Sequence, residues 1–270
     1  MPASPALIGF RYDRASSFQR GPADAPPLIR QALHTEASNG WSEALVDLRA
    51  PGVLHDRGDV LFAEHAAVRE DIEASVSHLL DEELLPLVLG GDHSITYPVV
   101  RAVAARHPGL NILHLDAHPD LYDSFEGDRY SHACPFARIM EDGLARRLVQ
   151  VGIRTLNGHQ KAQADRFGVE IIDMRSWRDD LTLAFEGPVY LSLDVDVLDP
   201  AFAPGVSHRE PGGLSVRQVV NLIQRFEGRL VGADVVEYNP RNDPLHLTAA
   251  VCAKLLKEIA TRMITQGDPR

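Results

Sequence analysis

The sequence of 270 residues has few cysteines, a deficit of positive charge and no long apolar run. Its two cysteines, Cys134 and Cys252, lie far apart and form neither a CxxC pair nor a disulfide framework, so both are expected to be thiols. Cys252, in AAVCAKLL, reads as a small buried apolar residue. No run of 18 apolar residues occurs, which excludes a transmembrane helix and gives no reason to expect a membrane partner.

Positive charge is scarce, with 27 Lys and Arg against 38 Asp and Glu and a formal net charge of -11. Because phosphate backbones are bound mainly by Lys and Arg, a nucleic-acid partner is not expected, whereas metal ions and cationic substrates suit an acidic protein. Charged residues occur too early in the segment 1–14 for it to contain the apolar core of a signal peptide. We therefore expect a cytoplasmic location.

The composition is that of an ordinary globular protein, with 44% hydrophobic and 24% charged residues. Single α/β domains of roughly 250 residues are common, and the chain shows no repeat, low-complexity tract or long linker. We therefore expect one domain over residues 1–270. The segments 22–27 and 204–213, rich in Gly and Pro, are expected to be loops within it.

Short apolar runs alternate with helical patterns along the chain, which is typical of βαβ units and a parallel sheet. Several runs are continuously apolar, as expected for strands covered by helices on both faces. The predicted strands are ALIGF (6–10), ALVDL (44–48), LLPLVL (84–89), LNILHL (110–115), LVQVGI (148–153), VEIID (169–173), VYLSLDV (189–195) and LVGADVV (230–236). Helices are predicted over residues 64–80, 94–107, 215–226 and 247–264, with Ser94 and Ser215 as N-caps of the second and third.

Polar clusters follow four of the predicted strands, which end before GGDHS, DAHPD, DVDVLDP and Glu237. In open parallel sheets ligands bind beyond the carboxyl ends of the strands, so these clusters are expected at one edge. Residues spaced by two in an extended segment point to the same face, which groups the acids and histidine of DAHPD and the two acids of DVD. Six side chains are expected to converge there: His93, Asp116, His118, Asp120, Asp194 and Asp196.

Four carboxylates in one cluster need a positive counter-charge. At about 4 Å each pair repels by roughly 4 kcal/mol at an effective dielectric constant of 20. Two divalent cations would neutralise four carboxylates, and oxygen ligands with imidazole suit a first-row metal such as Mn²⁺ better than structural Zn²⁺, which favours cysteine. We therefore expect two Mn²⁺ ions per subunit.

Joint spacing at successive strand ends separates these six residues from other acids and histidines. A single Asp at a strand end is usually a turn former, and a single His is usually a hydrogen-bonded residue without a catalytic role. The residues assigned to these ordinary roles are Asp123, Asp128, Asp199, His34, His55, His78 and His107.

Three motifs, GGDHS, LDAHPD and SLDVDVLDPAFAPG, together resemble the ureohydrolases, the family of arginases and agmatinases. The resemblance runs from Leu84 to Lys257, and segments such as VGIRTLN and AFAPGVSHREPGGLS are most similar to the plant-type arginase branch. It implies an arginase-like α/β fold, a three-layer αβα sandwich with a central, mainly parallel sheet. It also implies assembly as a homotrimer or homohexamer.

The resemblance implies a role for each residue of the metal cluster. One metal ion would be held by His93, Asp116, Asp120 and Asp194, and the other by Asp116, His118, Asp194 and Asp196. Asp116 and Asp194 would then bridge the two ions. Two cations that share a water lower the pKa of that water towards neutrality, which makes a nucleophile available.

The resemblance also implies how a small cationic guanidino substrate is cleaved to release urea. Glu237, in VVEYN, would pair with the guanidinium, whose fork geometry fits a carboxylate. His132, in YSHACPF, would shuttle the proton to the leaving amine, and its ordinary pKa near 6.5 suits that task. Asp120 would accept a hydrogen bond from the activated water.

The substrate tail is expected to meet residues that differ from those of animal-type arginases. Tyr122, Asn157 and His208 stand where those enzymes have an asparagine, an aspartate and a threonine. Arginine is the preferred substrate, and agmatine, which lacks the carboxylate, is the alternative, along with other guanidino acids. A carboxylate partner would come from an arginine, Arg154, Arg129 or Arg209, although each fits a surface or subunit salt bridge equally well.

Two other classes of protein fit the sequence less well. A metallophosphoesterase also uses a DxH motif across two metals, but this chain has no GNH[DE] block, and its acidic cluster does not suit phosphate. A non-catalytic scaffold with the same fold would be expected to have lost ligands, whereas all six positions are filled.

Overall fold

The computed structural model describes residues 4–63 and 67–266, and their centre is an eight-stranded sheet. The strand order is β2-β1-β3-β8-β7-β4-β5-β6, and every pairing between neighbours is parallel. The strands are β1 (Pro5–Arg11), β2 (His55–Leu61), β3 (Leu85–Leu89), β4 (Asn111–Leu115), β5 (Arg147–Ile153), β6 (Glu170–Asp173), β7 (Ala184–Asp194) and β8 (Glu227–Val236).

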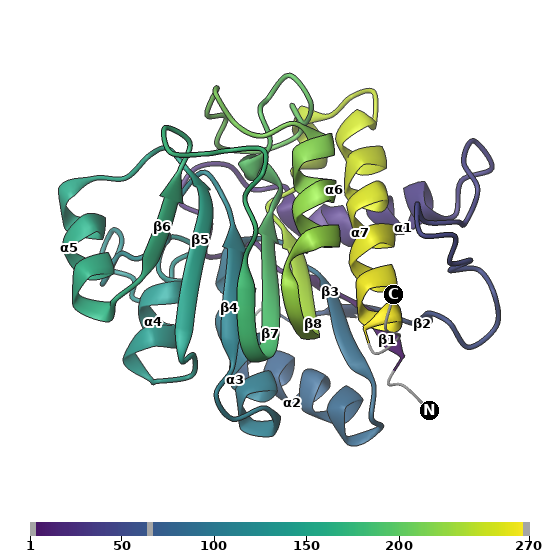
Figure 1. The fold of residues 1–270 in the computed structure, drawn as a ribbon, viewed down its shortest axis with the longest axis horizontal. Coiled ribbons are helices and arrows are strands. Elements are labelled where there is room, and N and C mark those ends of the chain that lie inside the picture. Colours follow the sequence, from purple (N-terminus) through teal and green to yellow (C-terminus); the bar gives the residue numbers. More distant parts are fainter. Residues whose placement is uncertain (1–3, 64–66, 267–270) are drawn as a thin grey trace.

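Helices cover both faces of the sheet and complete a three-layer αβα sandwich (Figure 1). Two apolar cores lie between the layers, one on each face. Residues of β3 and β4 are buried throughout, which explains why LPLVL is an unbroken apolar run and why NILHL is apolar apart from Asn111 and His114. One core packs under α1 (Ala25–Leu33), α6 (Val216–Arg225) and α7 (Leu247–Thr265). The other core packs under α2 (Val68–Asp81), α3 (Thr96–Arg106), α4 (Pro135–Glu141) and α5 (Gly158–Phe167). The predicted fold class is therefore confirmed.

One predicted strand, residues 44–48, is wrong. Leu45 in this segment has a φ of 62° and is 76% exposed, so the chain turns there rather than extending. The second strand of the chain is β2, which pairs only with β1 at the edge of the sheet. Its sequence, HDRGDVL, is mostly polar because an edge strand exposes much of its length to solvent, and it carries no apolar signal.

Helix starts also differ from the prediction in two places. The segment 22–27 is not a loop: the short 3-10 helix η1 (Pro22–Asp24) leads into α1, since proline is well suited to the first turn of a helix. Ser94 does not cap α3, because a 3-10 helix η2 (His93–Ile95) precedes it and Asp92 accepts a hydrogen bond from the Ser94 N–H. Of the helix predicted over 64–80, residues 64–66 lie outside the described residues.

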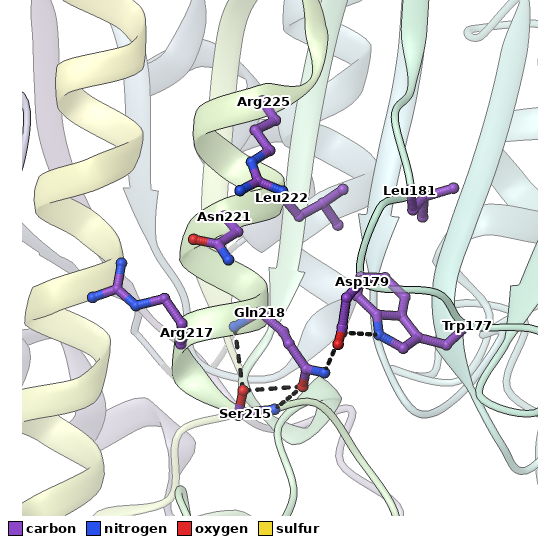
Figure 2. Close-up of a pocket in the computed structure, with 9 residues that line it drawn as sticks. All are labelled: Trp177, Asp179, Leu181, Ser215, Arg217, Gln218, Asn221, Leu222 and Arg225. Carbon is purple, nitrogen blue, oxygen red and sulfur yellow. Dashed lines mark hydrogen bonds between the residues drawn. The ribbon is translucent and has the colours of Figure 1, made fainter.

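The N-cap predicted at Ser215 is confirmed. Its hydroxyl accepts a hydrogen bond from the Gln218 N–H, and the Gln218 side chain accepts one from the Ser215 N–H, which is a capping box (Figure 2). This cap fixes the start of α6 where the loop 204–213 returns from the carboxyl edge of the sheet.

The strand order explains how distant motifs meet. Strands β3, β8, β7 and β4 are consecutive neighbours in the middle of the sheet, although β5 and β6 separate β3 and β4 from β7 and β8 in the chain. All four run in the same direction, so the polar clusters that follow them lie side by side at one edge. Within residues 4–63 and 67–266, no helix combines the length and apolarity needed to cross a bilayer.

Candidate active site

The first group of predicted ligands surrounds His93, which follows β3. Its Nδ1 lies 3.0 Å from Asp120 Oδ2, 3.2 Å from Asp194 Oδ2 and 3.3 Å from Asp116 Oδ2. His93 and Asp116 are fully buried, and the other two acids are almost so. The sequence therefore brings together one imidazole and three carboxylates from the ends of three strands.

Hydrogen bonds behind His93 leave its inner nitrogen free to bind a cation. His93 Nε2 lies 2.9 Å from Ser192 Oγ, and that hydroxyl donates its proton to Asp234 Oδ1 over 2.7 Å. Ser192 must then accept a hydrogen bond from Nε2–H, which leaves Nδ1 as a lone pair. In the described part of the chain Nδ1 has no hydrogen-bond partner, so a buried lone pair faces three carboxylates. A metal ion satisfies such an arrangement.

The second group surrounds His118, whose Nδ1 lies 2.9 Å from Asp196 Oδ2 and 3.3 Å from Asp116 Oδ1. Asp116 thus offers one oxygen to each histidine, as expected of a bridging ligand. Asp194 is oriented by the Asp196 N–H, which donates to its Oδ1 over 2.8 Å. Among the described residues, two groups of three side chains lie close enough to share an ion, and Asp116, His118 and Asp196 form one of these groups.

The charges in the cluster favour a bound cation. Burial, together with the nearby carboxylates of Asp196 and Asp116, raises the pKa of Asp194 well above its usual range. Burial lowers the pKa of His93, but its three carboxylate neighbours outweigh this effect and raise the pKa well above normal, so without a metal ion a proton on Nδ1 takes the place of the cation. Within residues 4–63 and 67–266, no Lys or Arg lines the cavity beside these four carboxylates and two imidazoles, and such an oxygen-rich set fits two divalent metal ions.

His114 is a member of the cluster that sequence reasoning missed. It is fully buried on β4, and its Nε2 donates to Asp116 Oδ2 over 2.8 Å while its Nδ1 accepts from Gln150 Nε2 over 3.0 Å. It also lies within reach of a shared ion with His93 and Asp116. Its position two residues before Asp116, on the same face of the strand, was the signal that would have revealed it. Its hydrogen bond orients Asp116.

Glu237 and His132 form a buried pair beside this cluster. Glu237 Oε1 accepts hydrogen bonds from His132 Nδ1 over 2.8 Å and from the His93 N–H over 2.9 Å. Burial raises the pKa of Glu237, but the charge and hydrogen bond of His132, together with the backbone N–H and charge of His93, outweigh burial and the net shift is downward. Burial lowers the pKa of His132, but the carboxylates of Glu237, Asp92 and Asp120 together outweigh burial and raise the pKa to about 9. The pair is therefore held as carboxylate and imidazolium.

Two of the predicted catalytic carboxylates have an unusual backbone. Asp120 and Glu237 have φ values of 51° and 65°, in the left-handed region that side chains other than glycine rarely adopt. Such a conformation costs of order 1–3 kcal/mol and persists where the surroundings hold it. The Glu237 N–H donates to Gly91 O over 2.9 Å, which fixes the turn that aims its carboxylate.

A cavity of about 230 Å³ opens over these groups. In the part of the chain that the structure describes, no Lys or Arg lines it, so it suits a cationic ligand. Sequence reasoning did not single out Ser17 or Glu210, which line it from loops outside the recognised metal motifs. The lining residues are Ser17, His118, Asp120, Tyr122, Phe125, His132, Ala133, Thr155, Gln160, Asp194, Asp196, His208, Glu210 and Glu237.

Of the three residues predicted to contact the substrate tail, two line the cavity and one does not. Tyr122 and His208 line the cavity, and the His208 ring centre lies 5.5 Å from that of His132. Asn157 is not among the lining residues: its Oδ1 caps α5 by accepting from Gln160 N–H, and its Nδ2 donates to Tyr122 Oη over 2.5 Å. Its observed role is therefore to hold Tyr122 and the start of α5.

The arginines suggested as partners of a substrate carboxylate are engaged elsewhere. Arg154 donates to five backbone carbonyls, including those of Asp196 and Glu210, and so ties loops together. Arg129 pairs with Asp123 and Glu141, and Arg209 Nε donates to Pro204 O. None of the three lines the cavity.

Asp199 has the turn-forming role assigned to it. Its carboxylate accepts hydrogen bonds from the N–H groups of Ala201, Gly212 and Gly213, over 2.9, 2.7 and 3.2 Å. These contacts join the start and the end of the loop that carries His208.

A larger hollow, of about 450 Å³, lies beside α6 and lacks this chemistry (Figure 2). Figure 2 shows Gln218 bridging from the helix cap to Asp179, which also accepts from the Trp177 indole. Among the described residues that line it, the charged side chains are Asp179, Arg217 and Arg225, and there is no histidine and no group of carboxylates. The catalytic candidate is the cavity at the carboxyl edge of the sheet.

A parallel αβα sandwich with carboxylates and imidazoles gathered at the carboxyl edge defines a metal-dependent hydrolase. Residues 3–261 match the profile of the Arginase family. The chain therefore belongs to the arginase family, whose members hydrolyse guanidino compounds at a binuclear metal centre. This membership sets aside a metallophosphoesterase. A non-catalytic scaffold with the same fold is disfavoured by the predicted ligands, because both His93 and His118 meet the expected carboxylates in the structure.

Known relatives agree with this assignment. "Arginase 1, mitochondrial" from Arabidopsis thaliana is 51% identical, over 97% of this chain and 81% of its own length. "Arginase 2, chloroplastic/mitochondrial" from the same plant is 50% identical, with the same coverage of both chains. The solved structure of the arginase from Medicago truncatula superposes with a TM-score of 0.93 at 48% identity, covering 97% of this chain and 88% of that one.

The names of these relatives correct one expectation. The two Arabidopsis thaliana proteins are named as mitochondrial or chloroplastic, and so is the Medicago truncatula arginase among the curated relatives, which is named as mitochondrial. The cytoplasmic location expected from the sequence is therefore wrong. That expectation depended on the early charges in residues 1–14, which argue only against a secretory signal peptide and do not bear on organelles.

Proposed function

We propose that this protein is an arginase, which hydrolyses L-arginine to L-ornithine and urea. The observation that carries the proposal is the buried Glu237 and His132 pair, which lies beside a cluster of four carboxylates in a cavity that no Lys or Arg of the described residues lines. A carboxylate fits the fork of a guanidinium, and a neighbouring imidazolium supplies the proton that the leaving amine needs. The names of the plant relatives support arginine as the substrate.

Each side chain has a distinct task in this proposal. His93, Asp116, His118, Asp120, Asp194 and Asp196 would hold two metal ions, which lower the pKa of a shared water. Glu237 binds the guanidinium and holds its carbon facing the carboxylate cluster. Asp120 accepts a hydrogen bond from the attacking water, and its left-handed backbone aims the carboxylate into the cavity. His132 gives its proton to the amine nitrogen as the C–N bond breaks, which completes ornithine and leaves urea.

We further propose Mn²⁺ as the metal, since four carboxylates and two imidazoles make a donor set richer in oxygen than Zn²⁺ usually takes. The test compares chelator-treated protein with the same protein after dialysis against Mn²⁺ or Zn²⁺. Urea release from arginine is expected to vanish on chelation and to return with Mn²⁺ at about two ions per chain. Unchanged activity after complete metal removal would refute the metal centre, and full recovery with Zn²⁺ alone would refute manganese.

Agmatine is the second candidate substrate. Arginine has a carboxylate that agmatine lacks, and no Lys or Arg in the described ranges lines the cavity to pair with it. Urea release by the Mn²⁺-loaded protein is measured with arginine, agmatine, guanidinobutyrate and guanidine. The expected result is a kcat/KM for arginine at least about tenfold above each of the others, equivalent to about 1.4 kcal/mol of transition-state binding. A higher value for agmatine would make the protein an agmatinase.

We also propose that residues 1–270 form one catalytic domain that assembles as a homotrimer or homohexamer. This proposal rests on the family resemblance of motifs along two thirds of the chain. Sedimentation equilibrium of the Mn²⁺-loaded protein is expected to give three or six times the chain mass of 29.7 kDa. A monomer mass at micromolar concentration would contradict it.

A further inference from the structure

A loop from the beginning of the chain reaches the site although it belongs to none of the metal-binding motifs. After β1, residues 12–20 cross to the GGDHS segment, where the Asp92 N–H donates to Tyr12 O over 2.9 Å and Asp92 Oδ2 accepts from Ala15 N–H over 2.9 Å. A Cβ on Gly91 would lie 1.7 Å from Tyr12 O, so this close approach requires glycine. The motif therefore fixes the loop as well as supplying a ligand.

Ser17 in this loop contacts the ring of His132. Its Oγ lies 2.8 Å from Nε2, and its backbone N–H lies 3.2 Å from the same atom. The other ring nitrogen, Nδ1, donates to Glu237 Oε1. His132 is only 7% exposed, whereas Ser17 is half-buried and lines the cavity. Ser17 therefore stands between a buried imidazole and the solvent that enters the cavity.

The two groups that Ser17 presents to Nε2 differ in what they can do. A backbone N–H only donates, so it suits the neutral ring, in which Nε2 carries a lone pair. A hydroxyl both donates and accepts, so it can remain bonded to Nε2 when that atom carries a proton. Of the partners of Nε2 within the described residues, the Ser17 hydroxyl alone can accept that proton.

Other charged or titratable groups face His132 from several elements, and Ser17 adds a different kind of contact. Acids favour its charged form by Coulombic attraction, whereas a hydroxyl also fixes where the Nε2 proton points. These neighbours are Glu237 after β8, Asp92 after β3, Asp120 after β4 and His208 in the loop after β7.

We propose that Ser17 is a positioning residue for the proton that His132 delivers. Its hydroxyl accepts the Nε2–H of the charged ring and so holds that proton at the cavity. As the C–N bond of the substrate breaks, the leaving nitrogen becomes basic, and the Nε2 proton exchanges its hydrogen bond to Ser17 Oγ for one to that nitrogen and is transferred to it. Ser17 O–H then donates to the lone pair left on Nε2. The ring regains its charge from the proton that the next attacking water releases as its oxygen adds to the guanidinium carbon, so the hydroxyl of Ser17 is unchanged over the cycle. This inference rests on the proposed function.

The kinetic test compares Ser17→Ala, Ser17→Thr and Ser16→Ala in the Mn²⁺-loaded protein. Ser16 is a matched control, because it lies in the same loop and its hydroxyl contacts Asp92 rather than His132. With arginine, Ser17→Ala is expected to lower kcat by about tenfold or more with KM changed less than twofold, since positioned proton transfer contributes about 10²–10⁴-fold. Ser17→Thr, which keeps a hydroxyl, is expected to recover most of kcat, and Ser16→Ala to retain it.

The spectroscopic test follows the His132 ring by ¹⁵N NMR against pH, with His132→Asn used to assign its signals. Loss of the hydroxyl that accepts from Nε2–H destabilises the charged ring, so the pKa of His132 is expected to fall by about one unit in Ser17→Ala. The alkaline limb of the kcat profile is expected to move to lower pH by the same amount.

An unchanged His132 titration, an unchanged kcat in Ser17→Ala, or equal losses in Ser16→Ala and Ser17→Ala would each overturn the role of Ser17. A threonine variant no better than alanine would overturn it as well. If the wild-type protein releases urea from none of the four substrates, the proposed function fails. The NMR comparison still reports in that case whether Ser17 supports the charged ring.

Discussion

Replacing Asp194 with alanine is expected to reduce urea release by roughly 10³-fold or more and to lower the bound metal well below two ions per chain. Asp194 Oδ2 lies 3.2 Å from His93 Nδ1, and Asp194 is one of the two carboxylates assigned as bridges. Metal ions supply several kcal/mol of transition-state stabilisation, and about 4 kcal/mol corresponds to a factor of about 10³. Metal analysis of the dialysed protein and initial rates with arginine measure both effects.

Asp199→Ala is the matched control for this experiment. Asp199 lies five residues further along the chain, but its carboxylate accepts only hydrogen bonds from backbone N–H groups of the loop 199–213. Its loss is expected to cost about 1 kcal/mol of stability and to leave the metal content near two. Asp194→Asn, which keeps the shape of the side chain that accepts from the Asp196 N–H, separates the loss of charge from the loss of the turn. Equal metal contents in Asp194→Ala and Asp199→Ala would show that the ligand assignment is wrong.

The sequence predicts the central strands well because burial leaves a direct mark on them. β3 and β4 are covered on both faces, so LPLVL is entirely apolar and NILHL is apolar apart from Asn111 and His114, and the polar clusters that follow the two strands are conspicuous. The edge strand β2 has the sequence HDRGDVL, which carries no such mark, and the prediction placed a strand at 44–48 instead. Solvent exposure at the edge removes the pattern on which the prediction depends.

The candidate site likewise contains some residues that the sequence reveals and others that it does not. Acids and histidines spaced by two at strand ends are visible in the sequence, and His93, Asp116 and Asp194 meet in the structure as predicted. The residues that orient them are not visible, because their roles depend on contacts across the sheet. Ser192 fixes the tautomer of His93 from β7, which is separated from β3 by β8, and Ser17 reaches His132 across 115 positions of sequence.

The residues that contact the substrate tail are the part of the site that the spacing of residues in the sequence predicts least well. Asn157 was expected to contact substrate, yet its side chain caps α5 and bonds to Tyr122. An asparagine before a helix is a common N-cap, and this local role outweighs its nearness to the motif. Arg154 was suggested as a partner for a carboxylate, but its guanidinium is taken up by backbone carbonyls of the loops around the site. Residue type alone does not show whether a side chain is already engaged.

Replacing Glu237 with glutamine is expected to leave two metal ions bound and to lower kcat/KM for arginine by about 10³-fold. The amide keeps the size of the side chain but loses the charge that pairs with a guanidinium. Hydrogen bonds to a charged partner are worth about 1.5–3 kcal/mol each, and a fork makes two of them. Metal content is preserved because Glu237 contacts His132 and the backbone of His93 rather than the carboxylate cluster.

The same substitution is expected to change the pH dependence through His132. Burial lowers the pKa of His132, but Glu237 together with Asp92 and Asp120 raises it to about 9, so the ring is charged below that pH and loses its proton as the pH rises through it. Without the carboxylate the pKa falls towards its ordinary value, and residual activity should decline at a correspondingly lower pH. Glu227→Gln, at the exposed start of the same strand, is the control and is expected to retain both the rate and the profile. A Glu237→Gln protein with the wild-type kcat/KM would remove Glu237 from the mechanism, because the loss of a charge that binds the reacting group cannot be silent.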